Sequence, residues 1–248
     1  RDSPYSTMDY NSEAVSADEF VKLVMKGVVY RGSKPVMWSP VEKTALAEAE
    51  IEYRDHRSTT IWVRFSIADG DLKGSDIVIW TTTPWTIPSN KAVAFNKSIT
   101  YGLYEIEEVQ DESWAKPKNT IILADKLAEQ TMEKSRVTKY KKIRELSLDD
   151  FNEITLTHPF SKLEGAESFW DYAVPLVEAD HVTDDAGTGF VHIAPSHGAE
   201  DFEVFLKRGW LSRMTNNVED DSSFSTAVPF FKGLQIFNKK GKEGEANR

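Results

Sequence analysis

The chain has 248 residues, of which 40% are hydrophobic and 11% aromatic, and a net charge of −10. This composition allows a sizeable core and excludes a chain that is disordered throughout. The absence of cysteine excludes disulfides and thiolate zinc sites, and no apolar run approaches the roughly 18 residues of a membrane span. The acidic balance argues against an autonomous nucleic-acid-binding domain, because most such affinity comes from neutralising phosphates.

The N-terminal part is polar and irregular, and we expect residues 1–15 to be a connection that arrives from elsewhere. Ser16 followed by Glu19 has the pattern of a capping box, so the apolar stripe that follows predicts a helix, closed by Gly27. Because the chain starts at Arg1 without an initiating methionine, we expect a piece excised from a larger protein.

Short extended runs dominate the rest of the chain. Strands are predicted at 52–55, 59–67, 76–83, 91–95, 100–109, 120–124, 153–157, 173–179 and 233–238. Helices are predicted from Asp125 to about Lys134 and again before Arg208. Many short strands with few helices favour an α+β domain built on a closed or nearly closed β-barrel with short peripheral helices. We expect this single domain to occupy 16–238, and residues 239–248 to be a severed linker or a disordered tail.

The first run that suggests a function is TTTPWTIPSN, at 81–90. It follows an apolar strand, so three threonine hydroxyls stand at the end of a buried element. Two prolines then turn the chain out of the sheet. The threonines are consistent with strand propensity alone, but hydroxyls in this position also suit the binding of a polar ligand edge.

The second run is HVTDDAGTGFVHIAPSHGAEDFEVFLKR, at 181–208. Gly187 and Gly189 predict a tight turn, and a short apolar strand with one polar residue, His192, follows it. Pro195 ends the strand. Helical spacing then places Asp201 in a first helical turn, where the helix dipole favours an ionised carboxylate. These features indicate either the rim of a pocket for a cationic ligand or an ordinary turn with a favourable dipole contact.

A third run, from Lys134 to Arg144, carries six basic residues in eleven, with Tyr140 among them. One interpretation is a solvated loop or strand face. The other is a patch that contacts phosphates.

Taken together, the runs at 81–90 and 186–202 resemble the editing domain inserted into class I isoleucyl-tRNA synthetases, with the valyl and leucyl enzymes as relatives. The segments YRGSKPVMWSP (30–40) and TALAEAEIEY (44–53) look like the isoleucyl version in particular. The resemblance covers essentially the whole chain. The family's His-Ile-Gly-His-type and Lys-Met-Ser-Lys-Ser-type signatures are not in the sequence, so ATP and magnesium belong only to the absent synthetic domain.

The resemblance implies an aminoacyl-tRNA ester hydrolase that removes valine wrongly attached to the tRNA for isoleucine. Its parent enzyme ligates isoleucine to tRNA using ATP. The implied partners are the tRNA 3′ end and the remainder of the synthetase in cis, in the cytoplasm and without a membrane. No cofactor and no metal is implied.

The resemblance also assigns roles by matching motif positions. Asp201 matches the residue that holds the substrate α-ammonium, and His192 the one that helps to limit side-chain size. Thr81, Thr82 and Thr83 match the strand that lines the aminoacyl and terminal-adenosine pocket, and Asn90 matches a position linked to editing. The implied catalytic groups are Asp201, Thr82, Thr83 and His192, which position a water that attacks the ester with help from the terminal ribose hydroxyl.

Three other interpretations stay open. A metal hydrolase could draw its ligands from His181, Asp185, His192, His197 and Asp201, although the chain contains no His-Glu-x-x-His pattern. A non-catalytic module could merely guide tRNA. Within the family, the valyl or leucyl version is the alternative to the isoleucyl one.

Overall fold

The computed structural model describes residues 6–152, 154–238 and 241–247. The chain divides into two compact units, residues 1–34 and 35–248. The first unit contains α1 (Tyr10–Met25), and the Asp9 carboxylate caps it by accepting the Asn11 N–H. The predicted helix start at Ser16 is therefore wrong. Ser16 lies inside the helix and its hydroxyl donates to the Ser12 carbonyl at 2.9 Å, because an aspartate further upstream offers the first N–H groups a cap.

The second unit is built on a nine-stranded mixed sheet in the order β11-β5-β10-β9-β3-β4-β7-β6-β8. The strands are β3 (Ile61–Ile67), β4 (Asp76–Thr81), β5 (Ala92–Phe95), β6 (Tyr101–Val109), β7 (Thr120–Ala124), β8 (Val137–Leu146), β9 (Thr155–Thr157), β10 (Ala173–Glu178) and β11 (Val191–Ile193). The pairs β10–β5 and β4–β7 are parallel, and the other neighbours are antiparallel.

The α+β class predicted from the sequence is confirmed, but a closed barrel is not found. Within the described ranges, the end strands β11 and β8 pair with one neighbour each and not with one another. Closure requires hydrogen bonds between the first and last strands. Strand patterns along the chain do not encode that pairing, so counting strands overpredicted it.

Shorter elements complete the unit. A hairpin of β1 (Trp38–Ser39) and β2 (Thr44–Ala45) precedes the sheet. The 3-10 helices are η1 (Glu48–Glu50), η2 (Pro84–Ser89), η3 (Asp125–Leu127), η4 (Leu148–Phe151), η5 (Leu211–Arg213) and η6 (Glu245–Asn247). The strand predicted at 52–55 is absent from this described part of the chain, and 233–238 carries only isolated bridges at Gln235 and Phe237.

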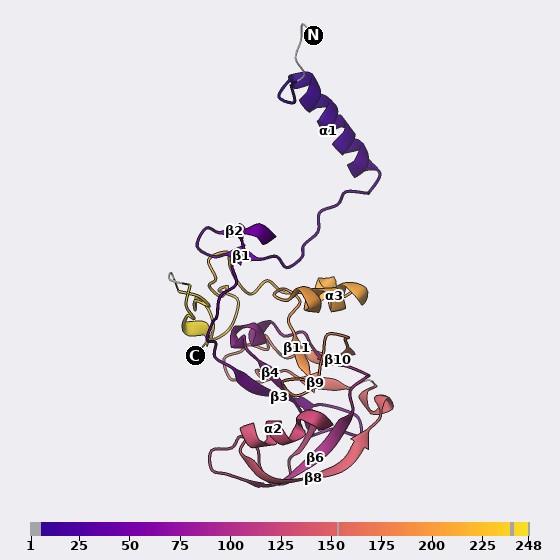
Figure 1. Ribbon diagram of the computed structural model, residues 1–248, viewed down its shortest axis with the longest axis vertical. Coiled ribbons are helices and arrows are strands. Elements are labelled where there is room, and N and C mark those ends of the chain that lie inside the picture. The colour runs from indigo at the N-terminus through magenta and orange to yellow at the C-terminus, as the bar shows by residue number, and fades with distance from the viewer. Residues whose placement is uncertain (1–5, 153, 239–240, 248) are drawn as a thin grey trace. The chain divides into compact units, whose positions relative to one another are not determined.

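Two short helices pack on the sheet, as Figure 1 shows. Val204 and Phe205 of α3 (Ala199–Lys207) are buried against Ile193 of β11 and its neighbours. Ala128 and Met132 of α2 (Ala128–Lys134) are buried against β6 and β7. Both helices were predicted from the sequence. Among the described residues, no helix has the length and apolarity needed to cross a membrane.

The C-terminal stretch that we expected to be a linker or tail is described for residues 241–247 only. Ala246 is buried in a cluster with Trp170 and Phe224. The Asn247 amide donates to the Ile236 carbonyl at 2.9 Å. Residues 239, 240 and 248 lie outside the described residues.

Candidate functional site

The threonine run begins at the end of β4. Thr81 is buried, and its hydroxyl oxygen accepts the Thr83 N–H at 3.1 Å, while Thr82 and Thr83 are exposed. The chain then enters η2, where Pro84 is favourable because the first helical position needs no N–H donor. The Thr86 hydroxyl closes this turn by donating to the Thr83 carbonyl at 2.9 Å. The hydroxyl run is therefore held by its own backbone.

His192 is connected to this run by a hydrogen bond. Its Nε2 lies 2.9 Å from Thr86 Oγ1. Since the Thr86 proton already goes to the Thr83 carbonyl, the histidine must donate through Nε2–H. Its Nδ1 is then the acceptor, and the Asn90 amide nitrogen lies 3.5 Å from it. Burial lowers the pKa of His192 to about 4, helped by the nearby His197, so the ring is neutral at physiological pH.

The strand alternation predicted around His192 is confirmed. Ile193 is part of the apolar cluster under α3, and Val191 packs against that cluster, whereas the ring of His192 bonds to η2. Thr86 was not singled out from the sequence. A threonine between two prolines, in a run already rich in hydroxyls, was the signal available.

Asn90 ends η2 and is fully buried. Its amide donates to the Ala92 carbonyl at 2.8 Å, and its backbone carbonyl accepts the Tyr172 hydroxyl. Its side-chain Oδ1 is buried without a hydrogen-bond partner among the described residues. Asn90 thus fixes the junction between η2 and β5 while leaving one acceptor unsatisfied.

Asp201 lies in the first turn of α3, as predicted. Its Oδ2 accepts the Ala194 N–H at 2.8 Å, and its Oδ1 is 4.0 Å from His181 Nε2. Burial raises the pKa of this carboxyl, against the lowering effects of the Ala194 N–H and of His181. Within the described chain the buried His181 Nε2 has no hydrogen-bond partner. Asp201 is therefore a partly buried carboxylate, with one oxygen hydrogen-bonded to a backbone N–H and the other without a hydrogen bond among the described residues.

The predicted residues form two neighbouring groups. Thr81, Thr83, His192 and Asn90 belong to one network through Thr86. Asp201 is joined to that network through β11, because Ala194 follows His192 by two residues. No group of three or more side chains that could hold a metal ion is found within the described ranges. Of the alternative ligands, Asp185 lies 3.4 Å from Lys126.

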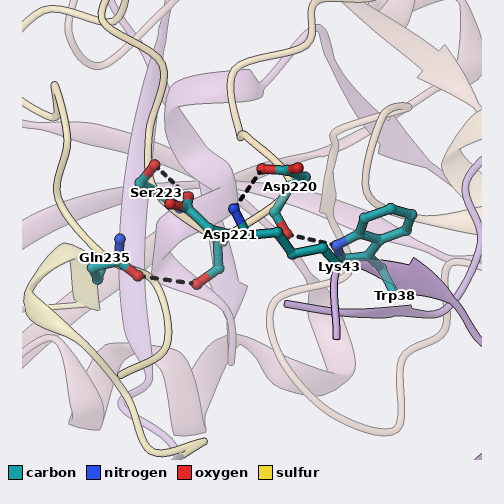
Figure 2. Close-up of polar contacts among 7 residues, drawn as sticks. Trp38, Lys43, Asp220, Asp221, Ser223 and Gln235 are labelled. Atoms are coloured by element: carbon teal, nitrogen blue, oxygen red, sulfur yellow. Dashed lines mark hydrogen bonds and ion pairs between the residues drawn. The ribbon is translucent and has the colours of Figure 1, made fainter. Parts of the chain in front are cut away.

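Two cavities lie beside these runs, the first lined by residues of both runs and the second by residues of the run 181–208 only. One, of about 410 Å³, lies between Trp85, His197 and the β1–β2 hairpin. The hairpin is held there by the Trp38 indole N–H, which donates to the Asp220 carbonyl at 2.8 Å, and by Lys43, 3.4 Å from the Asp220 carboxylate (Figure 2). The other, of about 260 Å³, lies at Trp80 and the Gly187 turn. Neither cavity is lined by the predicted catalytic residues.

Comparison with known proteins places the chain in a family. The family model described as "tRNA synthetases class I (I, L, M and V)" matches residues 1–228. The chain belongs to the class I tRNA synthetases. It is 53% identical over 99% of its length to the isoleucine–tRNA ligase of Ruegeria pomeroyi, and 46% identical over 99% to that of Bradyrhizobium diazoefficiens. It covers 26% and 25% of these relatives, so it spans about a quarter of their length. The family predicted from the two motifs is confirmed.

Among solved structures, the chain resembles GlLeuRS-CP1 with a TM-score of 0.46 and 14% identity, over 64% of this chain and 70% of the other. It also resembles the editing domain of the P. falciparum cytosolic leucyl-tRNA synthetase, with a TM-score of 0.41 and 11% identity, over 60% and 53% of the two chains. These TM-scores are below 0.5, so neither likeness bears on the residues of the site.

Proposed function

We propose that this class I synthetase segment is a hydrolytic editing domain, which removes valine from the tRNA for isoleucine after transfer, in the cytoplasm. The supporting observation is that Thr86 joins the two motifs. Its hydroxyl bonds to His192 at 2.9 Å and to the Thr83 carbonyl at 2.9 Å, so side chains more than a hundred residues apart act as one rigid wall. The uncommitted oxygen of Asp201 lies just beyond the end of the same strand.

In this proposal each group has a positioning role. The Asp201 carboxylate receives the substrate α-ammonium in a charge-assisted hydrogen bond. Thr82 and Thr83 hold the ester and the terminal ribose, while Thr81 and Asn90 keep the wall in place. A water molecule then attacks the ester carbonyl, assisted by the ribose hydroxyl. No side chain needs to act as a nucleophile, since orientation alone supplies a large part of the barrier reduction.

His192 supplies the size limit. The missing methylene of valine is worth only about 1–3 kcal/mol in an apolar pocket, a magnitude known from isoleucyl enzymes themselves. A neutral ring held on both sides, by Thr86 and by Asn90, cannot rotate away to admit isoleucine. A second site with such a wall would accept valine and exclude the larger residue.

The isoleucyl version is favoured over the valyl and leucyl ones because the curated relatives with 53% and 46% identity are named isoleucine–tRNA ligases. A module that only guides tRNA remains the rival from another functional class. Such a module would need contacts to the RNA but not the partly buried carboxylate of Asp201.

The test is deacylation by the purified chain. Transfer RNA for isoleucine would be charged with valine, threonine or isoleucine, and release of the amino acid measured with time. We expect release of valine and retention of isoleucine. Binding of all three tRNAs without any release would support the guiding module instead. Preferential release of threonine from valine-specific tRNA would indicate the valyl version.

A further inference from the structure

We propose that the cavity at Trp62 and Trp80 binds a nucleotide of the single-stranded tRNA end, upstream of the terminal adenosine. Its base stacks on the tryptophans and its phosphate contacts Lys134. We name this site the tryptophan cavity. It has a volume of about 260 Å³ and is lined by residues of β3, β4, α2 and the turn at Gly187. The identification of the ligand as tRNA rests on the proposed function.

The aromatic floor of the cavity is a cross-strand pair. Trp62 of β3 lies directly opposite Trp80 of β4, with ring centroids 6.3 Å apart and planes at 44°. Both side chains are only half-buried. Neither indole N–H has a hydrogen-bond partner in the part of the chain that the structure describes. Two half-buried indole rings with free donors suit base stacking, which tolerates any base and is a sequence-independent contact to single strands.

The charge at the cavity comes from one lysine. The other basic residues of the run 134–144 each form an ion pair, with these partners: Arg136 with Glu112, Lys139 with Glu107, Lys141 with Glu105, Lys142 with Asp125, and Arg144 with Asp150. Residues 136–144 are therefore a neutralised strand face, as one sequence interpretation held. Lys134 has no ion pair within the described residues and lines the tryptophan cavity.

A chain of net charge −10 needs such a local cation to hold a phosphate. The carboxylate that lines the cavity, Asp185, lies 3.4 Å from Lys126, so its repulsion of an anion is reduced. Exposed Gln130 adds amide donors and an acceptor for a base edge. The volume is below the roughly 300–1,000 Å³ of sites for drug-sized ligands, which suits one planar base with its phosphate outside.

The position of the cavity suits the nucleotide before the terminal adenosine. Trp80 directly precedes Thr81 on β4, and strand alternation directs the two side chains to opposite faces. Gly187 keeps the tryptophan accessible, because a Cβ there would lie 3.6 Å from the Trp80 ring, and its φ of +83° disfavours any side chain. In this proposal the terminal adenosine lies at Thr81–Thr83, and the nucleotide before it lies at the Gly187 turn.

The test is binding of a 5′-fluorescein-labelled single-stranded RNA ending in CCA to the whole 248-residue chain, followed by anisotropy over a range of salt concentrations. Lys134→Ala should weaken binding and reduce the slope of log K against log salt by about 0.7, the value for one phosphate contact on a single strand. The matched control is Lys141→Ala, since Lys141 lies on the neutralised face. It should leave both quantities unchanged.

The aromatic contact is tested at Trp62, which is half-buried in the described structure. Trp62→Ala should weaken binding by about 5- to 150-fold, the range for one stacked base, and Trp62→Phe should restore much of it. The parent chain should also lose tryptophan fluorescence on binding, and Trp62→Ala should lose less. Circular dichroism and thermal unfolding identify any variant that fails to fold. If Trp62→Ala does not fold, the comparison of Lys134→Ala with Lys141→Ala still tests the proposal.

Equal effects of Lys134→Ala and Lys141→Ala would overturn the proposal, and so would absence of RNA binding by the parent chain. The proposed function fails separately. A chain that binds the RNA with this dependence on Lys134 but releases no valine from charged tRNA would keep the cavity and refute the hydrolase. Release of valine by a chain whose RNA binding does not depend on Lys134 would refute the cavity and keep the hydrolase.

Discussion

The Nε2 atom of His192 and the hydroxyl oxygen of Thr86 are 2.9 Å apart, although 106 residues separate them in the chain. This contact makes the two motifs interdependent. If the ring of His192 limits the size of the accepted amino acid, its position depends on a threonine that itself is fixed by the Thr83 carbonyl. The size limit is then a property of the network and not of one side chain.

Replacement of His192 by alanine should relax the size limit rather than abolish hydrolysis. Exclusion by overpacking is worth roughly 1–3 kcal/mol, so release of isoleucine from correctly charged tRNA should increase about tenfold to a hundredfold. Release of valine should be largely kept. Single-turnover deacylation of both charged tRNAs measures this ratio. Equal loss on both substrates would mean that His192 is structural.

Thr86→Val tests whether the limit depends on the network. Valine keeps the shape but removes the acceptor for the His192 N–H, which leaves a buried donor unsatisfied at a cost of about 1–3 kcal/mol. The variant should therefore be less stable and should release some isoleucine, in the same direction as His192→Ala. Urea unfolding and the same deacylation assay give the two readouts. A stable variant with full exclusion would separate Thr86 from the size limit.

Asp201→Asn should lose deacylation while the fold stays intact. The amide oxygen can still accept the Ala194 N–H, so the link to β11 survives, but the charge that receives the α-ammonium is gone. Loss of a charge-assisted hydrogen bond costs about 1.5–3 kcal/mol, which would appear mainly in KM. Glu200→Gln, an exposed residue of the same helical turn, is the matched control. If Asp201→Asn hydrolyses Val-tRNA at the parent rate, the assignment is wrong.

The sequence predicted the local structure around the candidate site better than the contacts within it. Pro195 marked the end of β11, and the helix period placed Asp201 in the first turn of α3, whereas β4 ends at Thr81, two residues before the predicted end. The partners across the fold could not be read from local patterns. Thr86 lies inside η2 between two prolines, a pattern that does not identify its partner, and its bond to His192 depends on how η2 packs against β11.

The same limit applies to the fold as a whole. The strand prediction for β3 was correct within two residues, because its alternation is local. The predicted closed barrel was not found in the described residues, because closure requires hydrogen bonds between the end strands β11 and β8, which are far apart in the sheet order. For the basic run 134–144 the sequence left two interpretations open, a solvated strand face or a patch that contacts phosphates, and the acidic partners of residues 136–144 could not be read from it. Two of those partners, Glu105 and Glu107, lie on β6, and the register of β6 with β8 sets these two pairs.

His181 should tune the carboxylate that it faces. The charge of His181 lowers the pKa of Asp201, against the rise caused by burial. His181→Ala removes this lowering, so the pKa of Asp201 should rise further, and the acidic limb of the deacylation profile should move to higher pH. The pH dependence of single-turnover release measures the shift. A variant with lower activity but an unchanged profile would show that His181 acts on packing alone.

Stability should fall between pH 6.5 and pH 4 because of three histidines, of which His158 and His192 are buried and His197 is partly buried. Burial lowers the pKa of His158, His192 and His197 from 6.5 to about 4 in each case. Above pH 6.5 these rings are neutral in both the folded and unfolded chain, so their contribution does not change. Between pH 6.5 and pH 4 the three histidines bind protons in the unfolded chain but stay neutral in the folded chain. Each ring should then lower the free energy of unfolding by about 1.4 kcal/mol per pH unit.

His158→Gln isolates one of these contributions. The ring nitrogen Nε2 of His158 lies 3.1 Å from the Ile87 carbonyl, and its Nδ1 accepts the Phe160 N–H at 3.1 Å. Glutamine can keep one of these bonds but does not titrate, so the variant should lose about a third of the slope. His56→Gln, at an exposed position, should leave the slope unchanged. Urea unfolding at pH 7, 6 and 5 gives the slope of unfolding free energy against pH for the parent, His158→Gln and His56→Gln. Identical slopes in the parent and His158→Gln would contradict the neutral, buried state of the His158 ring.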